Sequence, residues 1–89
     1  MNATAAVDEF MPHVDVDVAL GMSYLYLHAP GESRTTARTI EVESGILLDL
    51  DAEGCPLGVE RFGDAEVPTM KLICLGVDTN HVNLLLLHP

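Results

Sequence analysis

Apolar and polar residues alternate with a period of two along much of this chain, which is typical of β-strands with one solvated face. Valines alternate with aspartates in the first such stretch, and Tyr24 and Tyr26 alternate with leucines in the second. Turn-forming residues such as glycine, serine and proline separate the stretches. The pattern predicts strands at residues 13–18, 22–29 and 35–43, followed by a hairpin over 46–62.

The hairpin over 46–62 has the most informative pattern. In its first half, Ile46, Leu48 and Leu50 alternate with Leu47, Asp49 and Asp51. Ala52-Glu53-Gly54 then breaks the run, and Gly54 can adopt the positive φ of a tight turn at little cost. Pro56 lacks an amide hydrogen, so we expect it at the start of the returning strand. The later apolar residues are spaced by two and then by three, which suggests a bulge or a strand that ends near Arg61.

The two ends of the chain are less regular. Residues 1–12 are expected to be a leader, either frayed or forming a short helix over 5–10 capped by Thr4. Residues 13–89 are expected to form a single β-rich domain. Within it, the segments 69–77 and 81–87 are interpreted as a second hairpin. A short helix over 69–77 is the alternative, because apolar residues there also fit helical spacing.

The predicted fold is therefore mainly β, a single antiparallel sheet that is curled or barrel-like. Several predicted strands carry apolar side chains on both faces, and one sheet with one core cannot hide all of them. Either the sheet closes on itself or it pairs with a second copy of the chain, so a homo-oligomer is expected. The candidate interface residues are Tyr24, Tyr26, Leu84, Leu85, Leu86 and Leu87.

Charge narrows the classes of partner. The chain has 89 residues, of which 48% are hydrophobic, and a formal net charge of −10. Such a chain gains nothing from counterion release on nucleic acid and is repelled by an anionic membrane, whereas a basic protein partner or simple solubility fits. The N-terminus lacks the basic and apolar regions of a secretion signal, so a cytoplasmic location is expected.

One acidic stretch matches the ligand spacing of a calcium loop. Asp49, Asp51, Glu53, Gly54 and Glu60 occupy positions 1, 3, 5, 6 and 12 of that pattern. A calcium loop needs a helix on each side, and both flanks here are predicted strands. The acidic turn of a hairpin explains the same residues, so binding of a divalent metal or small ligand is kept as the minority hypothesis.

Other chemistry finds little support in the sequence. The four histidines have no short ligand spacing, no serine lies in a Gly-x-Ser-x-Gly context, and no glycine-rich phosphate loop is present. We therefore expect a protein that is not an enzyme and needs no cofactor.

The central part of the chain contains a series of short motifs in a fixed order. They are Tyr26-Leu27, Thr39-Ile40-Glu41, Leu48-Asp49-Leu50-Asp51, Gly54 and Gly58-Val59-Glu60. In these motifs the chain resembles a family of small bacterial and phage proteins known as domain of unknown function 2283, and the resemblance covers about half of the chain, from Val18 to Phe62.

This resemblance implies a small antiparallel β-domain of bacterial or phage origin, without an established activity. The chain departs from the family pattern at Val18-Ala19 and Ser23, where relatives carry a Tyr-Asp pair and an aspartate, and the segment after Val67 has no counterpart. The resemblance and the negative charge together lead us to expect a small acidic protein that acts through protein contacts. An inhibitor or antitoxin that binds a basic surface of its partner is an example.

Overall fold

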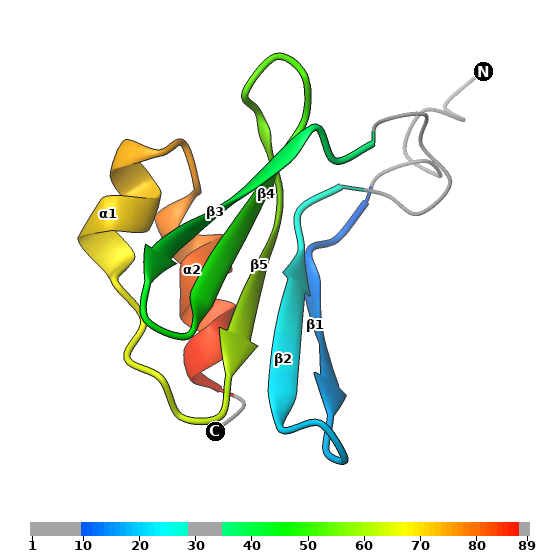
Figure 1. Cartoon of the computed structure of the whole chain (residues 1–89), viewed down its shortest axis with the longest axis vertical. Helices are drawn as coiled ribbons and strands as arrows, with labels where there is room; N and C mark the ends of the chain where they lie inside the picture. The colour runs from blue at the N-terminus through cyan, green and yellow to red at the C-terminus, as the bar shows by residue number, and fades with distance from the viewer. Residues whose placement is uncertain (1–9, 29–34, 88–89) are drawn as a thin grey trace, which may run out of the picture.

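The computed structural model describes residues 10–28 and 35–87. In these two ranges the chain forms five strands and two helices (Figure 1). Their bounds are β1 (His13–Asp17), β2 (Met22–Tyr26), β3 (Arg38–Glu43), β4 (Ile46–Leu50), β5 (Pro56–Phe62), α1 (Thr69–Cys74) and α2 (Thr79–Leu86). The predicted leader helix over 5–10 lies almost wholly outside the described residues.

All five strands belong to one antiparallel sheet in the order β1-β2-β5-β4-β3. Strands β3, β4 and β5 follow one another as a meander, and β5 then pairs with β2 of the N-terminal hairpin. The mainly β architecture built from hairpins is confirmed. The sheet is open, with β1 and β3 as its two edges, so the barrel-like version of that expectation is wrong.

The hairpin between β4 and β5 forms where the sequence predicts it. Gly54 has a φ of 84°, and its amide donates to the carbonyl of Asp51 at 3.0 Å. The Asp51 side chain turns into the loop, where its Oδ1 accepts from the amides of Glu53 at 3.0 Å and Cys55 at 2.8 Å. Asp51 is buried, with 7% of its surface exposed. Its carboxylate stabilises the turn by accepting these two hydrogen bonds inside the loop.

The returning strand differs from the prediction at its end. β5 continues to Phe62 without a break in its pairing with β2, so it does not end near Arg61. An irregularity does occur in this strand, but near its start: Asp49 pairs with Gly58 and Leu50 with Pro56, so the register with β4 shifts by one residue there and not between Val59 and Phe62. Phe62 faces the opposite side of the sheet from Val59, and Arg61 occupies the inward position. It is 8% exposed, and its guanidinium donates to the carbonyls of Ala65 and Leu85 at 2.8 and 3.2 Å.

The C-terminal third is helical, so the predicted hairpin over 69–77 and 81–87 is wrong, and the alternative helix within 69–77 is confirmed by α1. Gly76, with a φ of 101°, follows α1, and Asp78 caps α2 by accepting from the Asn80 amide at 2.8 Å. The run of four leucines has no period of its own, so its length and composition fit a strand as well as a helix.

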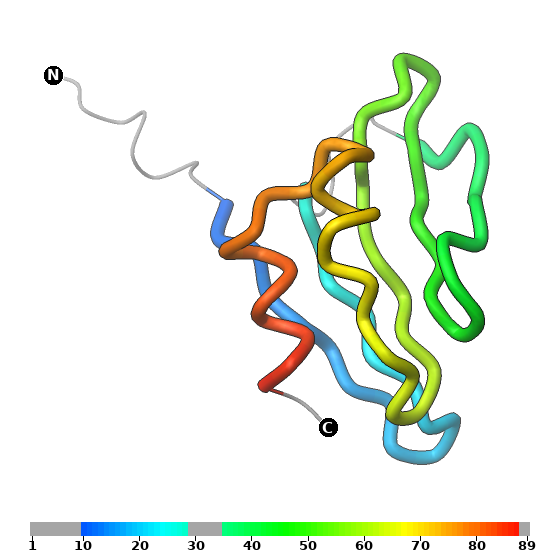
Figure 2. The backbone as a smooth tube through the Cα atoms, turned by 90° about the vertical axis from the view of Figure 1, so that its left-hand side faces the viewer, coloured from blue at the N-terminus to red at the C-terminus, as the bar shows by residue number. Residues whose placement is uncertain are grey.

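Both helices cover the same face of the sheet, with α2 packed against β1 and β2 (Figures 1 and 2). The core lies between these two layers, and each fully buried aliphatic side chain contributes about 1.5–3 kcal/mol. Its buried members are Leu25, Ile46, Leu48, Leu50, Val59, Leu72, Val77, Val82 and Leu85. The helix layer therefore covers one apolar face of the sheet, including Ile46 and Leu48, while Leu47 lies on the other face.

Candidate functional site

The face of the sheet opposite the helices, here called the open face, is covered by no helix or strand of the described residues (Figure 2). The pairing register assigns side chains to it from all five strands. They are His13, Asp15 and Asp17 of β1, Met22, Tyr24 and Tyr26 of β2, Thr39 and Glu41 of β3, Leu47 and Asp49 of β4, and Glu60 and Phe62 of β5. Gly58 is the one position in the middle of this surface without a side chain.

A hydrogen-bonded network crosses the centre of the open face. The Tyr24 hydroxyl donates to Oδ2 of Asp49 at 2.6 Å, and the Thr39 hydroxyl donates to Oδ1 of the same carboxylate at 2.5 Å. The three residues come from β2, β3 and β4, so one carboxylate links strands on both sides of β5. Hydrogen bonds to an ionised acceptor are the strong kind, and this network holds both oxygens of Asp49 in place.

Gly58 makes this network geometrically feasible. The phenol of Tyr24 lies across the backbone of β5 at this glycine, and a methyl group there would overlap the Tyr24 ring. A glycine inside a strand often marks such a close approach. The glycine, the tyrosine and the aspartate therefore form one structural unit, in which Gly58 provides the space that lets Tyr24 reach Asp49.

Burial and neighbouring charge raise the pKa of two groups on the open face, Tyr24 within this unit and Glu60 beside it. The pKa of the Tyr24 hydroxyl is raised well above its ordinary value by burial and by its hydrogen bond to Asp49, so it stays protonated and donating. The pKa of Glu60 is raised as well, by partial burial first and then by the charge of Asp49. The carboxylate of Glu60 thus lies close enough to Asp49 for the two negative charges to repel each other.

Aromatic rings extend the open face toward β1. The Tyr24 and Tyr26 rings have centroids 4.8 Å apart, and the His13 ring stacks on Tyr26 at 5.1 Å with an interplanar angle of 21°. Phe10 meets His13 edge-on, with ring centroids 5.8 Å apart. Four rings in succession form a rigid aromatic surface beside the carboxylates.

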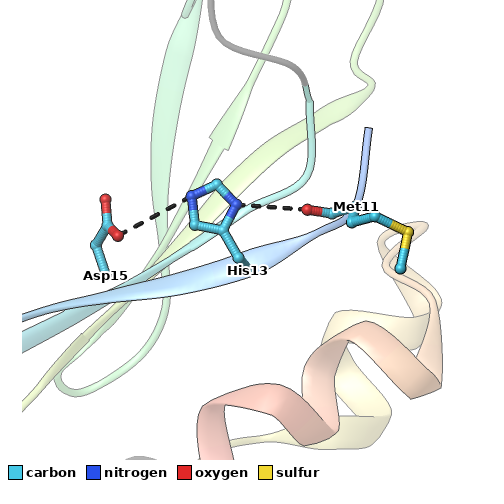
Figure 3. A network of polar contacts seen from close by, with 3 residues as sticks. All are labelled: Met11, His13 and Asp15. Atoms are coloured by element: carbon cyan, nitrogen blue, oxygen red, sulfur yellow. Dashed lines mark hydrogen bonds and ion pairs between the residues drawn. The ribbon is translucent and has the colours of Figure 1, made fainter. Parts of the chain in front are cut away.

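His13 is held in this row by two polar neighbours (Figure 3). Its Nδ1 lies 3.4 Å from the carbonyl oxygen of Met11, and its Nε2 lies 4.0 Å from Oδ1 of Asp15. The contact with Met11 requires the hydrogen on Nδ1, because a carbonyl oxygen only accepts. His13 thus lies exposed on the strand surface, and its stacking on Tyr26 has no signal in the sequence.

No lysine or arginine of the described residues lies on the open face. Three of the four basic residues of the chain are described, and each lies elsewhere. Arg38 alternates with Ile40 on the helix side of β3, Arg61 is buried beneath α2, and Lys71 of α1 forms an ion pair with Glu43. The open face carries five carboxylates, Asp15, Asp17, Glu41, Asp49 and Glu60, and no lysine or arginine among the described residues.

The structure does not assemble the residues of the calcium-loop pattern as a metal site. Asp49 is engaged by Tyr24 and Thr39, Asp51 accepts from loop amides, and Glu53 is exposed. The flanking elements are strands, whereas a calcium loop of this type lies between helices. Within 10–28 and 35–87, no three His, Cys, Asp or Glu side chains group in a way that suits a metal ion.

The predicted interface residues fall into two separate places. Tyr24 and Tyr26 lie on the open face, whereas the leucines belong to α2 and its end. Leu85 is fully buried and Leu84 is packed against the core, while Leu86 and Leu87 are 53% and 70% exposed. The strand expected over 81–87 is instead α2 and its end, so the leucines there form no apolar strand that a second copy would have to cover; the oligomeric state itself stays a prediction.

The fold and this surface define a two-layer protein, with an antiparallel sheet whose one face is covered by helices and whose other face is aromatic and acidic. Comparison with family models, curated proteins and solved structures found no match to this chain. The resemblance to domain of unknown function 2283 therefore stays a prediction. Neither helix of the described segments has the length and apolar character needed to cross a membrane.

Proposed function

We propose that this protein is a binding protein without enzymatic activity, and that its open face docks a basic surface of a partner protein. The observation that supports the proposal is the separation of charge: five carboxylates lie on the open face, and the described cations lie off it. A surface adapted for solubility alone would carry positive and negative charges mixed together, and the open face carries only negative ones among the described lysine, arginine, aspartate and glutamate residues.

The neighbouring side chains suit lysine and arginine. Carboxylates accept hydrogen bonds from guanidinium and ammonium groups, and the faces of tyrosine rings attract the same cations. Tyr24 and Tyr26 are half-buried and held by stacking, so little side-chain entropy is lost when they are covered. A cation placed beside Glu60 would also offset the partial burial and the charge of Asp49, which together raise the pKa of Glu60.

Not every carboxylate is equally available. Both oxygens of Asp49 already accept hydrogen bonds, and Oδ1 of Asp17 accepts from the Leu20 amide at 3.1 Å. Glu41 and Asp15 are exposed, and Glu60 is half-buried between them in the same cross-strand row. We expect Asp15, Glu41 and Glu60 to make the contacts, with Asp49 positioning Tyr24. An inhibitor or antitoxin that covers a basic protein surface is one biological form of this activity.

The experiment uses the protein itself as bait for a displayed library of random 12-residue peptides. We expect enrichment of sequences with several lysines or arginines, whose binding weakens steeply as salt rises from low to physiological concentration. The triple variant Asp15→Asn, Glu41→Gln, Glu60→Gln should lose this enrichment. A variant with the same charge change in loops, Glu53→Gln, Asp64→Asn, Glu66→Gln, should keep it.

Two outcomes would contradict the proposal. One is enrichment of apolar or acidic peptides that ignore salt. The other is equal loss of binding in both neutralised variants, which would show that total charge, and not this face, governs association.

Divalent-metal binding at Asp49–Glu60 is the competing proposal and has less support, because Asp49 and Asp51 already have hydrogen-bond donors. A saturable rise in melting temperature with millimolar Ca²⁺, lost in Glu53→Gln, would favour it.

A further inference from the structure

The two edges of the sheet differ in how well they suit an additional strand. β1 pairs with β2 in an unbroken register over all five residues, from His13↔Tyr26 to Asp17↔Met22. β3 is interrupted by a bulge between Glu41 and Glu43. Bulges are one of the devices that protect an edge from pairing. By this criterion β1 is the edge that is regular enough to extend the sheet.

The surroundings of the two edges strengthen this difference. At β3, Lys71 of α1 reaches over to form an ion pair with Glu43, so a side chain from the helix layer approaches that edge. At β1, four of the five residues are exposed and Val14 is partly buried. Two shallow hollows lie beside the strand. One, of about 530 Å³, is lined by Asp15, Asp17 and Tyr24 on the open face. The other, of about 240 Å³, is lined by Val16 and Ser23 on the opposite side.

The side chains of β1 have a sharp division between the two faces. Asp15 and Asp17 point to the open face, and Val14 and Val16 point to the helix side. Val14 is partly buried against the core, whereas Val16 is 45% exposed, so apolar surface remains to be covered at this edge. A strand added here would place its own side chains alternately beside carboxylates and beside valines.

The placement of aspartates on one face of β1 and valines on the other determines which kind of strand can pair with it. A second copy paired through β1 in antiparallel fashion about Asp15 or Val16, the registers that pair most of the strand, would set aspartates opposite aspartates, and like charges facing each other across strands are destabilising. A strand with lysine or arginine at alternate positions and apolar residues between them complements both faces at once. The same arrangement would place the basic side chains next to the tyrosine and histidine rings on the open face.

We infer that the edge of β1 binds an extended segment of a basic partner as a sixth strand, with its lysine or arginine side chains on the open face and its apolar side chains toward Val14 and Val16. This inference rests on the proposed function and adds to it the conformation of the partner segment and the edge that binds it. Backbone hydrogen bonds provide affinity in this mode, and alternate side chains provide specificity.

The test is an amide NMR titration of the full chain with a capped peptide of alternating lysine and valine, seven residues long and beginning and ending with lysine. The largest shifts are expected at Val14–Asp17, together with slower hydrogen exchange there. A block peptide of the same composition, with the lysines together, should bind at least about tenfold more weakly, because it cannot match both faces.

Backbone methylation of the peptide separates strand pairing from simple charge attraction. Two forms are made, N-methylated at the lysines or at the valines. In a paired strand only one of these sets directs its amides at β1, so one form should bind like the parent and the other about tenfold more weakly or worse. Asp15→Lys should also weaken the parent peptide by about tenfold, and Asp64→Lys, in an exposed loop, by less than about twofold.

The outcomes distinguish the two proposals. If both methylated forms bind equally and the shifts lie at Glu41, Leu47 and Glu60, the basic segment docks on the open face without extending the sheet. The inference then fails and the proposed function stands. If no basic peptide binds in a manner that depends on salt and on the open-face carboxylates, both fail.

Discussion

Neighbouring residues of β4 face opposite sides of the sheet and belong to two different environments. Leu48 has no exposed surface and packs beneath the helices, whereas Asp49 faces the open side and accepts hydrogen bonds from Tyr24 and Thr39. The covered face is aliphatic and gains its stability from burial of apolar area. The open face combines crowded carboxylates with aromatic rings and gains little from burial. The same backbone thus supports a face that favours folding and a face whose charges oppose it.

The contrast shows where to look for function in a small β-protein. A covered face must satisfy packing, so its residues are explained by the fold alone. An open face needs only enough polarity to stay solvated, and mixed charges would meet that need. Residues that go beyond it, such as Glu60 beside Asp49 or the half-buried Tyr24, call for another explanation. We attribute them to binding.

The largest effect should come from adjacent substitutions on opposite faces of β4. Leu48→Ala should lower the free energy of unfolding by about 2–5 kcal/mol, because it leaves a cavity under the helices. Leu47→Ala, on the half-buried open side, should cost less than about 1 kcal/mol. Urea denaturation followed by circular dichroism measures both. Equal losses would mean that the open face is packed as tightly as the core.

A buried arginine on the covered face should give the next largest effect. Arg61 donates to Ala65 in the loop after β5 and to Leu85 in the last turn of α2, where a cation is also favoured by the helix dipole. Arg61→Met should cost about 2 kcal/mol, since hydrogen bonds from a charged group are lost. Arg38→Met, on the exposed edge strand, is the matched control and should cost less than about 0.5 kcal/mol. An unchanged denaturation midpoint for Arg61→Met would refute this role.

Gly58 allows a test of the open-face network. Gly58→Ala should displace the Tyr24 ring and cost about 1–3 kcal/mol, as overpacking does. Tyr24→Phe in the natural background should cost about 1 kcal/mol, because Asp49 loses a donor. In the Gly58→Ala background the same change should cost little, since the hydrogen bond is already broken. A double-mutant cycle measures the coupling, and strictly additive losses would argue against the unit.

The smallest effect concerns the pH dependence contributed by Glu60. Its pKa is raised above the ordinary value of 4.5 in the folded protein, so the folded state binds a proton more readily than the unfolded chain. The corresponding stability is present below pH 4.5 and is lost as pH rises through the folded pKa. Glu60→Gln, which stays neutral, should therefore be at least as stable as the natural chain at pH 7, and this difference should shrink toward pH 4. Stability curves at several pH values would show the opposite trend if Glu60 were held by a favourable charge.

Local pattern was sufficient for the strands of the sheet. Alternation and Gly54 predict the β4–β5 hairpin, and alternation in β2 correctly sets Tyr24 and Tyr26 opposite Leu25. It failed in the C-terminal third, where four consecutive leucines have no period and the cap at Asp78 looks like any turn residue. Cap chemistry before an apolar run is the signal that would have favoured a helix.

The candidate site was only partly visible in the sequence. Tyr24 and Asp49 meet because β2 pairs with β5, a contact between distant segments for which the sequence contains no local signal. The sequence pattern placed Asp51 in an acidic turn and Arg61 near a strand end, yet both are buried with hydrogen-bond partners. Gly58 in the interior of a strand was the available clue to a close approach.

The claim that the carboxylates of the open face serve a partner and not the fold has a direct test in the protein alone. The measurement is the free energy of unfolding of the triple variant Asp15→Asn, Glu41→Gln, Glu60→Gln at low ionic strength. Charges about 10 Å apart in water repel by roughly 0.4 kcal/mol per pair, so we expect the variant to match or exceed the natural chain by up to about 1 kcal/mol. A loss of more than about 1 kcal/mol would show that folding needs these carboxylates and would contradict the account.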